Sequence, residues 1–297
     1  MEKTKRRILL AIDSGDSSRQ AIPVAARIAK LMRSELLVTH VWAPEFSSRT
    51  KKWQMEPPSQ LTALLATVLD ELKALGVGAQ SELRAAGPDG VAAEIVAAAK
   101  SYGADLIIVG SRGLSDLASL FLGSVSHQVL ARSDCPLLVV KGGPGRDEPI
   151  RRILLAVADE DEVPAVVEAT VDIAAPAKAE VLVLHARYLL PAGMRAAFVE
   201  PDEESIALVD TVVRQLREAG VEASNESMLD RYGLAREILD SAKTWNADLI
   251  VVGSRRLSDL AALVLGSTAH AVIRRTDRPV LVARRSETRR GKPKPKR

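Results

Sequence analysis

The chain has almost no aromatic residues and a single cysteine. Phe, Trp and Tyr make up 3% of its 297 residues, whereas hydrophobic residues make up 47%. A core with so few aromatic rings has to be built from Ala, Val, Leu and Ile, as in layered α/β proteins. Cys135 cannot form a disulfide within the chain, which is typical of proteins from the reducing cytosol. The length predicts about two domains of ordinary size.

Long apolar runs are also missing. No run approaches the roughly 18 residues that a membrane-spanning helix needs. The stretch "KTKRRILLAID" superficially resembles a signal peptide, but its apolar run is short and stops at Asp13. We therefore expect a buried first strand in a cytoplasmic protein that makes no membrane contact.

Basic charge is concentrated at one end of the chain. Residues 284–297, "RRSETRRGKPKPKR", carry eight Lys/Arg and one Glu, a net charge of +7. Because the whole chain has a net charge of +3, residues 1–283 are left with −4. The Pro and Gly content of the basic segment predicts a disordered tail. Two interpretations of this tail stay open: a solvated end, or weak binding to nucleic acid or another polyanion.

One unit is used twice. The stretch "RRILLAID" at 6–13 recurs as "RRILLAVA" at 151–158, and residues 104–140 recur at 247–283 with 24 identities in 37 positions. The segment "KGGPGRDEPI", rich in Gly and Pro, separates the copies. We therefore expect a first domain at 1–143, a second at 149–284 and a basic tail at 285–297.

Short apolar runs bounded by turn residues predict buried strands in the first copy, at 8–12, 36–41, 106–109, 137–140 and, with a weaker pattern, 79–84. Helical periodicity fills the gaps, for example at 22–29, after a cap at Asp16 or Ser17. Such alternation predicts a mostly parallel sheet covered by helices. Ligands bind such sheets beyond the carboxyl ends of the strands, where the strand order reverses. The loops after the first and fourth strands are therefore the candidate site.

The loop after the fourth strand, "VGSRGLSDLASLFLGSVS", has the spacing G-x2-G-x9-G-S at Gly110, Gly113, Gly123 and Ser124. Glycine at 110 leaves room for a ribose, and glycine at 113 permits positive φ and close contact with phosphates. Gly123 and Ser124 open a helix whose free N–H groups favour an anion. The alternative is structural: the glycines only turn the chain and Ser124 only caps the helix.

This motif, with Asp13 ending the first strand and His40-Val41 ending the second, resembles the ATP-binding subgroup of the universal stress protein family. The resemblance covers both copies. It implies two tandem Rossmann-like domains of the adenine nucleotide alpha hydrolase-like type, each a five-stranded parallel sheet with helices on both faces. It also implies pairing of the last strands of the two domains across a pseudo-twofold axis, with a further homodimer as an extension.

The resemblance implies an ATP site in the first copy, with Mg²⁺ bridging phosphate oxygens. Asp13 and the Val41 backbone are expected to face the adenine, although Asp13 keeps a competing interpretation as a helix cap. The expected contacts to ribose and phosphates are Gly110, Arg112, Gly113, Gly123, Ser124, Val125 and Ser126. Arg112 has an alternative role in a solvated loop with local ion pairs. No residue pattern indicates a catalytic group, and no cluster has the spacing of zinc ligands.

The second copy departs from the motif, because Asp13, Gly113 and Ser126 align with Ala158, Arg256 and Ala269. We expect a degenerate site in a structural domain; the alternative is that Arg256 contacts phosphate in a working site. The histidines recur in pairs, His40 with His185 and His127 with His270, which favours structural roles for all four.

The leading hypothesis for function is a nucleotide-dependent sensor or interaction module of the stress response, with one ATP per chain. A slow ATPase, a nucleotide-free scaffold and a protein that binds cyclic AMP remain the alternatives.

Overall fold

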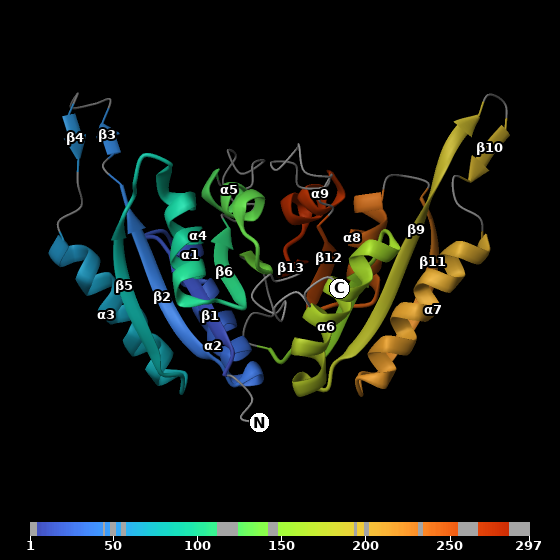
Figure 1. The fold of residues 1–297 in the computed structure, drawn as a ribbon, viewed down its shortest axis with the longest axis horizontal. Coiled ribbons are helices and arrows are strands. Elements are labelled where there is room, and N and C mark those ends of the chain that lie inside the picture. The colour runs from blue at the N-terminus through green and yellow to red at the C-terminus, as the bar shows by residue number, and fades with distance from the viewer. Residues whose placement is uncertain are drawn as a thin grey trace, which may run out of the picture. The chain divides into compact units, whose positions relative to one another are not determined.

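The computed structural model describes residues 5–43, 45–47, 52–54, 58–111, 124–141, 148–192, 195–198, 202–230, 234–254 and 267–284. The chain divides into two compact units, one covering residues up to 142 and the other residues 143–285. Each unit is a sheet with helices packed on both of its faces (Figure 1).

In the described part of the first unit, five strands form a parallel sheet. They are β1 (Arg7–Ile12), β2 (Glu35–Trp42), β5 (Ala79–Ala85), β6 (Leu106–Ser111) and β7 (Leu137–Lys141), in the order β7-β6-β1-β2-β5. β1 pairs in parallel with both β2 and β6. Ile8, Leu9 and Leu10 of β1 are 0% exposed, as a strand covered on both faces requires. The predicted strands are confirmed, including the weaker one at 79–84.

Two pairs of helices cover this sheet. α2 (Ala21–Met32) packs beside α3 (Pro58–Ala74), and α4 (Gly90–Tyr102) packs beside α5 (Ser124–Arg132) on the other face. The residues at helical spacing in 22–29, Ile22, Ala25, Ala26 and Ala29, are all buried, and the small alanines let this helix lie close to the sheet. A hairpin of β3 (Glu45–Ser47) and β4 (Lys52–Gln54) follows β2 in the chain.

The predicted helix cap at Asp16 or Ser17 is wrong. The short helix α1 (Asp16–Arg19) begins at Asp16, so both residues lie inside it. The chain turns earlier because the side chain of Asp13 holds the turn that precedes the helix.

The described part of the second unit repeats this arrangement. Its parallel strands are β8 (Arg152–Ala156), β9 (Glu180–Ala192), β11 (Ala223–Asp230), β12 (Leu249–Gly253) and β13 (Val280–Ala283), in the order β11-β9-β8-β12-β13. β10 (Arg195–Phe198) pairs antiparallel with the end of β9. The helical segments are the 3₁₀ turn η1 (Glu160–Glu162), α6 (Val163–Ala177), α7 (Asp202–Glu218), α8 (Leu234–Thr244) and α9 (Ser267–Arg275).

One pair of side-chain contacts shows how closely the two units correspond. In the first unit the Arg7 guanidinium lies 5.7 Å from the Tyr102 ring centroid and donates to the Tyr102 carbonyl at 3.0 Å. In the second unit Arg152 lies 5.9 Å from the Trp245 ring and donates to the Trp245 carbonyl at 3.3 Å. A cation over an aromatic ring therefore ties the start of the first strand to the end of the corresponding helix in both copies.

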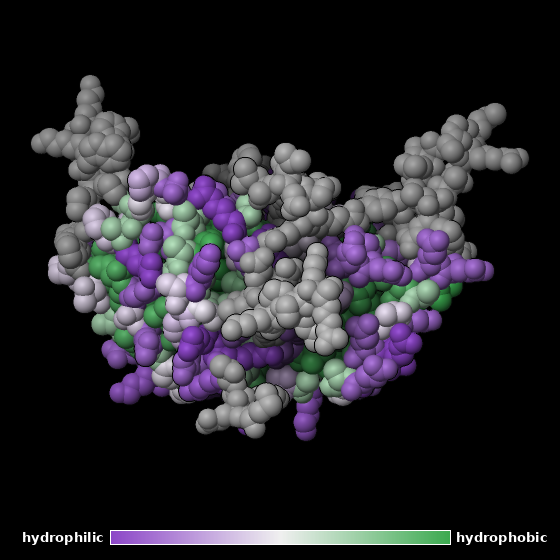
Figure 2. Space-filling model, viewed as in Figure 1, coloured by the Kyte–Doolittle hydropathy of each residue, from purple (hydrophilic) through white to green (hydrophobic). Residues whose placement is uncertain are grey.

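The face in Figure 2 shows hydrophilic residues interspersed with apolar ones over the described parts of the chain. Among the described residues, no helix is both long enough and apolar enough to cross a membrane.

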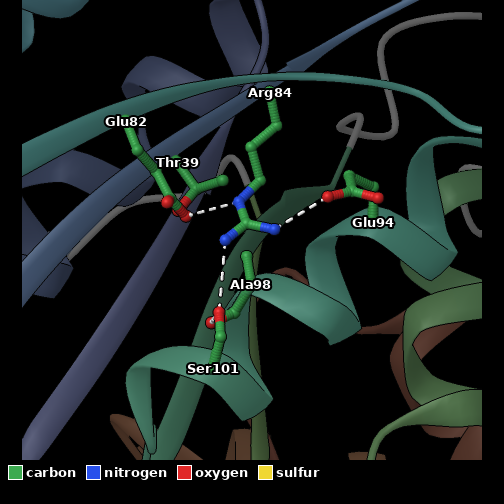
Figure 3. Close-up of polar contacts among 6 residues, drawn as sticks. All are labelled: Thr39, Glu82, Arg84, Glu94, Ala98 and Ser101. Atoms are coloured by element: carbon green, nitrogen blue, oxygen red, sulfur yellow. Dashed lines mark hydrogen bonds and ion pairs between the residues drawn. The ribbon is translucent and has the colours of Figure 1, made fainter.

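A polar cluster at the edge of the first sheet is specific to that unit (Figure 3). The Arg84 guanidinium of β5 donates from Nη1 to Glu94 of α4 at 2.8 Å and from Nη2 to Ser101 at 3.2 Å. Arg84 Nε lies 3.1 Å from Glu82 Oε1, an ion pair whose N–H is not aligned for a hydrogen bond. The buried hydroxyl of Thr39 donates to the same Glu82 oxygen at 2.9 Å. The hydrogen bond to Glu94 raises the pKa of Arg84 above its ordinary value.

This cluster joins β2, β5 and α4, and the second unit replaces its central residues. Strand register aligns Arg84 with Met228 and Thr39 with Leu184. The second unit therefore lacks both the guanidinium and the hydroxyl at the corresponding positions.

We expect Arg84→Met to lower the free energy of unfolding by about 1–3 kcal/mol, because Glu94 loses its hydrogen-bonded cation and Glu82 loses its ion-pair partner. Urea denaturation measures this change. The matched control is Lys5→Met, which removes an exposed ion pair with Glu35 at 3.6 Å and should cost less than about 1 kcal/mol. Equal shifts for the two variants would show that the cluster contributes no more than a surface pair.

Candidate functional site

The carboxyl ends of β1 and β6 lie side by side in the first unit. The register runs from Ile8 with Leu106 to Ala11 with Val109, so Gly110 follows at the same level as Ile12. β2 lies on the other side of β1, and the strand order therefore reverses between β1 and β6. This is the position at which open α/β sheets bind ligands. The strand ends that precede these two loops are thus adjacent, as the sequence predicts.

Asp13, the first residue after β1, holds the turn into α1. Its Oδ1 accepts a hydrogen bond from the Gly15 N–H at 2.9 Å and another from the Ser18 hydroxyl at 2.5 Å. The Asp13 N–H donates to the Ser18 Oγ at 3.0 Å. Asp13 therefore closes the turn that leads into α1, but the backbone N–H that it accepts from is that of Gly15, which precedes the helix. Both hydrogen bonds are accepted by Oδ1. The turn therefore orients the exposed Asp13 carboxylate, and Oδ2 takes no part in these two contacts.

His40 anchors the end of β2 to the end of β1. Its Nδ1 lies 3.0 Å from the Ile12 carbonyl, and the ring is 4% exposed. A carbonyl only accepts, so the proton of the ring lies on Nδ1 in this contact. The structural role predicted for His40 is confirmed, and His185 repeats it with the Val157 carbonyl at 2.9 Å.

Val41 of β2 lies one residue beyond the level at which the neighbouring strand β1 ends. The next carbonyl, that of Trp42, accepts from the Ala86 N–H at 2.8 Å on the β5 side. Because successive peptide groups of a strand point to opposite edges, the Val41 carbonyl points to the β1 side. β1 extends only to Ile12, which is level with His40. The Val41 side chain is 7% exposed, so the backbone is the part of this residue that can meet a ligand.

The first turn of α5 faces the end of β6. Ser126 is 6% exposed, and its hydroxyl lies 3.5 Å from the Gly110 carbonyl, the outer limit of a hydrogen bond. α5 begins at Ser124, and Val125 is half-buried. The first N–H groups of a helix have no intrahelical partner, so they can donate to an anion. Arg112, Gly113 and Gly123 lie outside the described residues.

The second unit has lost the hydrogen-bonded pair that holds the first turn. Ala158 and Val163 stand where the first unit has Asp13 and Ser18, so both partners of the 2.5 Å hydrogen bond are replaced together. Asp159 holds the turn instead, because its Oδ1 accepts from the Glu162 N–H at 3.2 Å. Ala269, which replaces Ser126, is buried without a hydroxyl to offer.

Sequence reasoning missed Glu162. Its carboxylate lies against the Cα of Gly253, so closely that a methyl group there would overlap both oxygens. Gly253 ends β12 and corresponds to Gly110 of the first unit. Glu162 closes a run of four acidic residues, 159–162, directly after the first strand. That run was the available signal, but only the fold shows which of its side chains turns toward Gly253.

A model of the universal stress protein family matches residues 5–141 and again residues 149–284. A universal stress protein from Mycobacterium tuberculosis is 28% identical over 302 residues, covering 95% of this chain and 97% of that protein. The crystal structure of a universal stress protein from Archaeoglobus fulgidus has a TM-score of 0.76 at 22% identity, covering 95% of this chain and 99% of that one. Another Archaeoglobus fulgidus universal stress protein, solved in complex with dAMP, is 24% identical over 46% of this chain and 99% of its own, with a TM-score of 0.36.

The two family matches fall on the two sequence repeats. The mycobacterial relative spans both repeats, and the structural likeness over the same length shows the fold of the whole tandem. The chain therefore belongs to the universal stress protein family and contains two copies of its domain in tandem.

Proposed function

We propose that the first unit binds one ATP at the carboxyl ends of β1 and β6, and that the chain serves the stress response as a nucleotide-dependent sensor or interaction module. The second unit is its structural partner. The observation that carries this proposal is the contrast between the two units at the place where the strand order reverses. The first has an exposed carboxylate on an ordered turn beside Gly110, whereas the second has lost that carboxylate and holds Glu162 against Gly253.

The adenine-facing groups of this proposal are Asp13 and the Val41 backbone. The 6-amino group of adenine is a donor and suits a carboxylate, while ring nitrogens accept from N–H groups. The Ser18 and Gly15 hydrogen bonds hold the Asp13 carboxylate in place before a ligand arrives. Such preorganisation reduces the entropy that binding would otherwise cost.

The phosphate-facing groups are those of the glycine motif and of the first turn of α5. Gly113 and Gly123 let the backbone approach the phosphates, and Ser124, Val125 and Ser126 place N–H groups and hydroxyls at the helix start. Arg112 adds a cation to the same loop. Mg²⁺ enters the proposal only as a partner of the phosphates, since it binds such sites mainly through phosphate oxygens and water.

The link from nucleotide to partner runs through the segment 111–122. This segment joins β6 to α5, and in the proposed pose its backbone contacts the phosphates. Occupancy would therefore change the surface that the segment offers to another protein. Limited proteolysis with and without ATP tests this link, and identical cleavage of the segment in both conditions would contradict it.

One prediction from the proposed function concerns the identity and amount of the ligand. The purified protein is denatured and the released nucleotide is measured, or the protein is titrated with ATP. Either assay should give about one ATP per chain, bound at the glycine motif. Gly113→Arg, which copies Arg256 of the second unit, should reduce this to near zero. Titrations with cyclic AMP and dAMP show which adenine nucleotide the site prefers. The absence of any adenine nucleotide in both assays would leave a nucleotide-free scaffold.

A second prediction from the proposed function concerns Asp13. We expect Asp13→Ala to weaken ATP binding by about 10- to 100-fold, the loss of one hydrogen bond to a charged group. Asp159→Ala is the matched control, because it removes the corresponding turn-holding carboxylate of the second unit. It should cost similar thermal stability and leave ATP affinity unchanged. Equal losses of affinity in the two variants would mean that Asp13 acts only on the fold.

A further inference from the structure

We infer that Glu162 fills the ligand position of the second unit and thereby excludes an adenine nucleotide from it. The inference rests on the proposed function, since it assigns a nucleotide to the corresponding position of the first unit. In this inference a single side chain, that of Glu162, blocks nucleotide binding in the second unit. Reversing the replacements at 158, 256 and 269 is then not sufficient to restore binding.

The contact lies at the end of β12. Glu162 is 9% exposed, and its carboxylate oxygens and Cδ are the nearest atoms to the place where Gly253 would carry a side chain. In the first unit the glycine at the end of the fourth strand is the one proposed to leave room for the ribose. The Glu162 carboxylate therefore occupies, within its own unit, the space that a ribose would need.

Local backbone structure keeps Glu162 in this position. Asp159 Oδ1 accepts from the Glu162 N–H and closes the turn η1. α6 begins at the next residue, Val163, which is 5% exposed, and the helix packs against β12. The backbone of Glu162 is therefore fixed between a capped turn and a packed helix, and its side chain starts from a defined position beside Gly253.

Charge adds to the effect of volume. Residues 159–162 of the second unit are all acidic, whereas the aligned residues 14–17 of the first unit are Ser, Gly, Asp and Ser. Ser17 aligns with Glu162, so a small hydroxyl-bearing residue is exchanged for a longer anion. A nucleotide is itself an anion, and like charges at short range repel most strongly where water is excluded.

Arg256 fits this account as a sequence change that accompanies Glu162. Compared with the aligned Gly113 and Ser17 of the first unit, Arg256 adds one cation in the loop after the fourth strand and Glu162 adds one anion in the loop after the first. These two substitutions together add no net charge. Restoring Gly at 256 alone would therefore leave the added anion in place.

The test is to rebuild the second site with and without Glu162. The starting variant carries Ala158→Asp, Arg256→Gly and Ala269→Ser, and ATP bound per chain is measured by equilibrium dialysis with labelled ATP. We expect about one ATP in the wild type and in this triple variant, because the carboxylate still fills the site. Adding Glu162→Ser should raise the value to about two, and adding Glu162→Gln should not, because the amide fills the same space.

The reciprocal change tests the same idea in the first unit. Ser17→Glu in the wild-type chain should lower ATP affinity at least about 10-fold, whereas Ser17→Gln separates volume from charge. Circular dichroism and thermal melting confirm folding, and the first site of the rebuilt chains is an internal control. A second ATP in the triple variant with Glu162 present, or no second ATP after Glu162→Ser, would overturn the inference. A wild type that binds no nucleotide would overturn the proposed function instead, and the inference with it.

Discussion

The parallel pairing of β1 with β6 is the constraint on which the candidate site depends. A parallel ladder brings the carboxyl ends of neighbouring strands to one edge, so residues 98 positions apart, Ile12 and Gly110, meet at the same level of the sheet, with Asp13 next in the chain. β1 ends at Ile12, which is level with His40, and so leaves the Val41 carbonyl without a neighbouring strand on that side. Both features follow from backbone pairing and would survive most changes of surface side chains.

The two units share this strand arrangement and differ in the side chains of the turns that follow their first strands. His40 and His185 bind the carbonyls that end their first strands at nearly equal distances, 3.0 and 2.9 Å, and a cation over an aromatic ring closes the opposite end of each sheet. The turns that follow the first strand of each unit are held by different hydrogen bonds. Asp13 with Ser18 has become Ala158 with Val163, while Asp159 has taken over the turn. Because neither member of a hydrogen-bonded pair is useful alone, such residues are expected to change together.

Several site residues could be predicted because their signals are local. The glycine spacing, Asp13 after an apolar strand and the recurrence of His40 as His185 are visible in the sequence, and the histidines do make the predicted structural contacts. The cap at Asp16 or Ser17 was wrong because a side chain three residues upstream of Asp16 holds the turn. The Arg84 cluster escaped prediction because its partners come from β2, β5 and α4, and no short window contains them.

By itself, the sequence determined the repeat, the α/β alternation and the side of the sheet on which a ligand would lie. Apolar periodicity and glycine spacing are properties of short segments, and parallel sheets place their functional loops at one edge. Only the tertiary structure decided that Asp13 caps a turn through one oxygen, and that Glu162, unlike its acidic neighbours, lies against Gly253. The Asp13 contacts lie within five residues and select between roles that the sequence left open, whereas the position of Glu162 depends on how α6 packs against β12, two elements that are far apart in the chain.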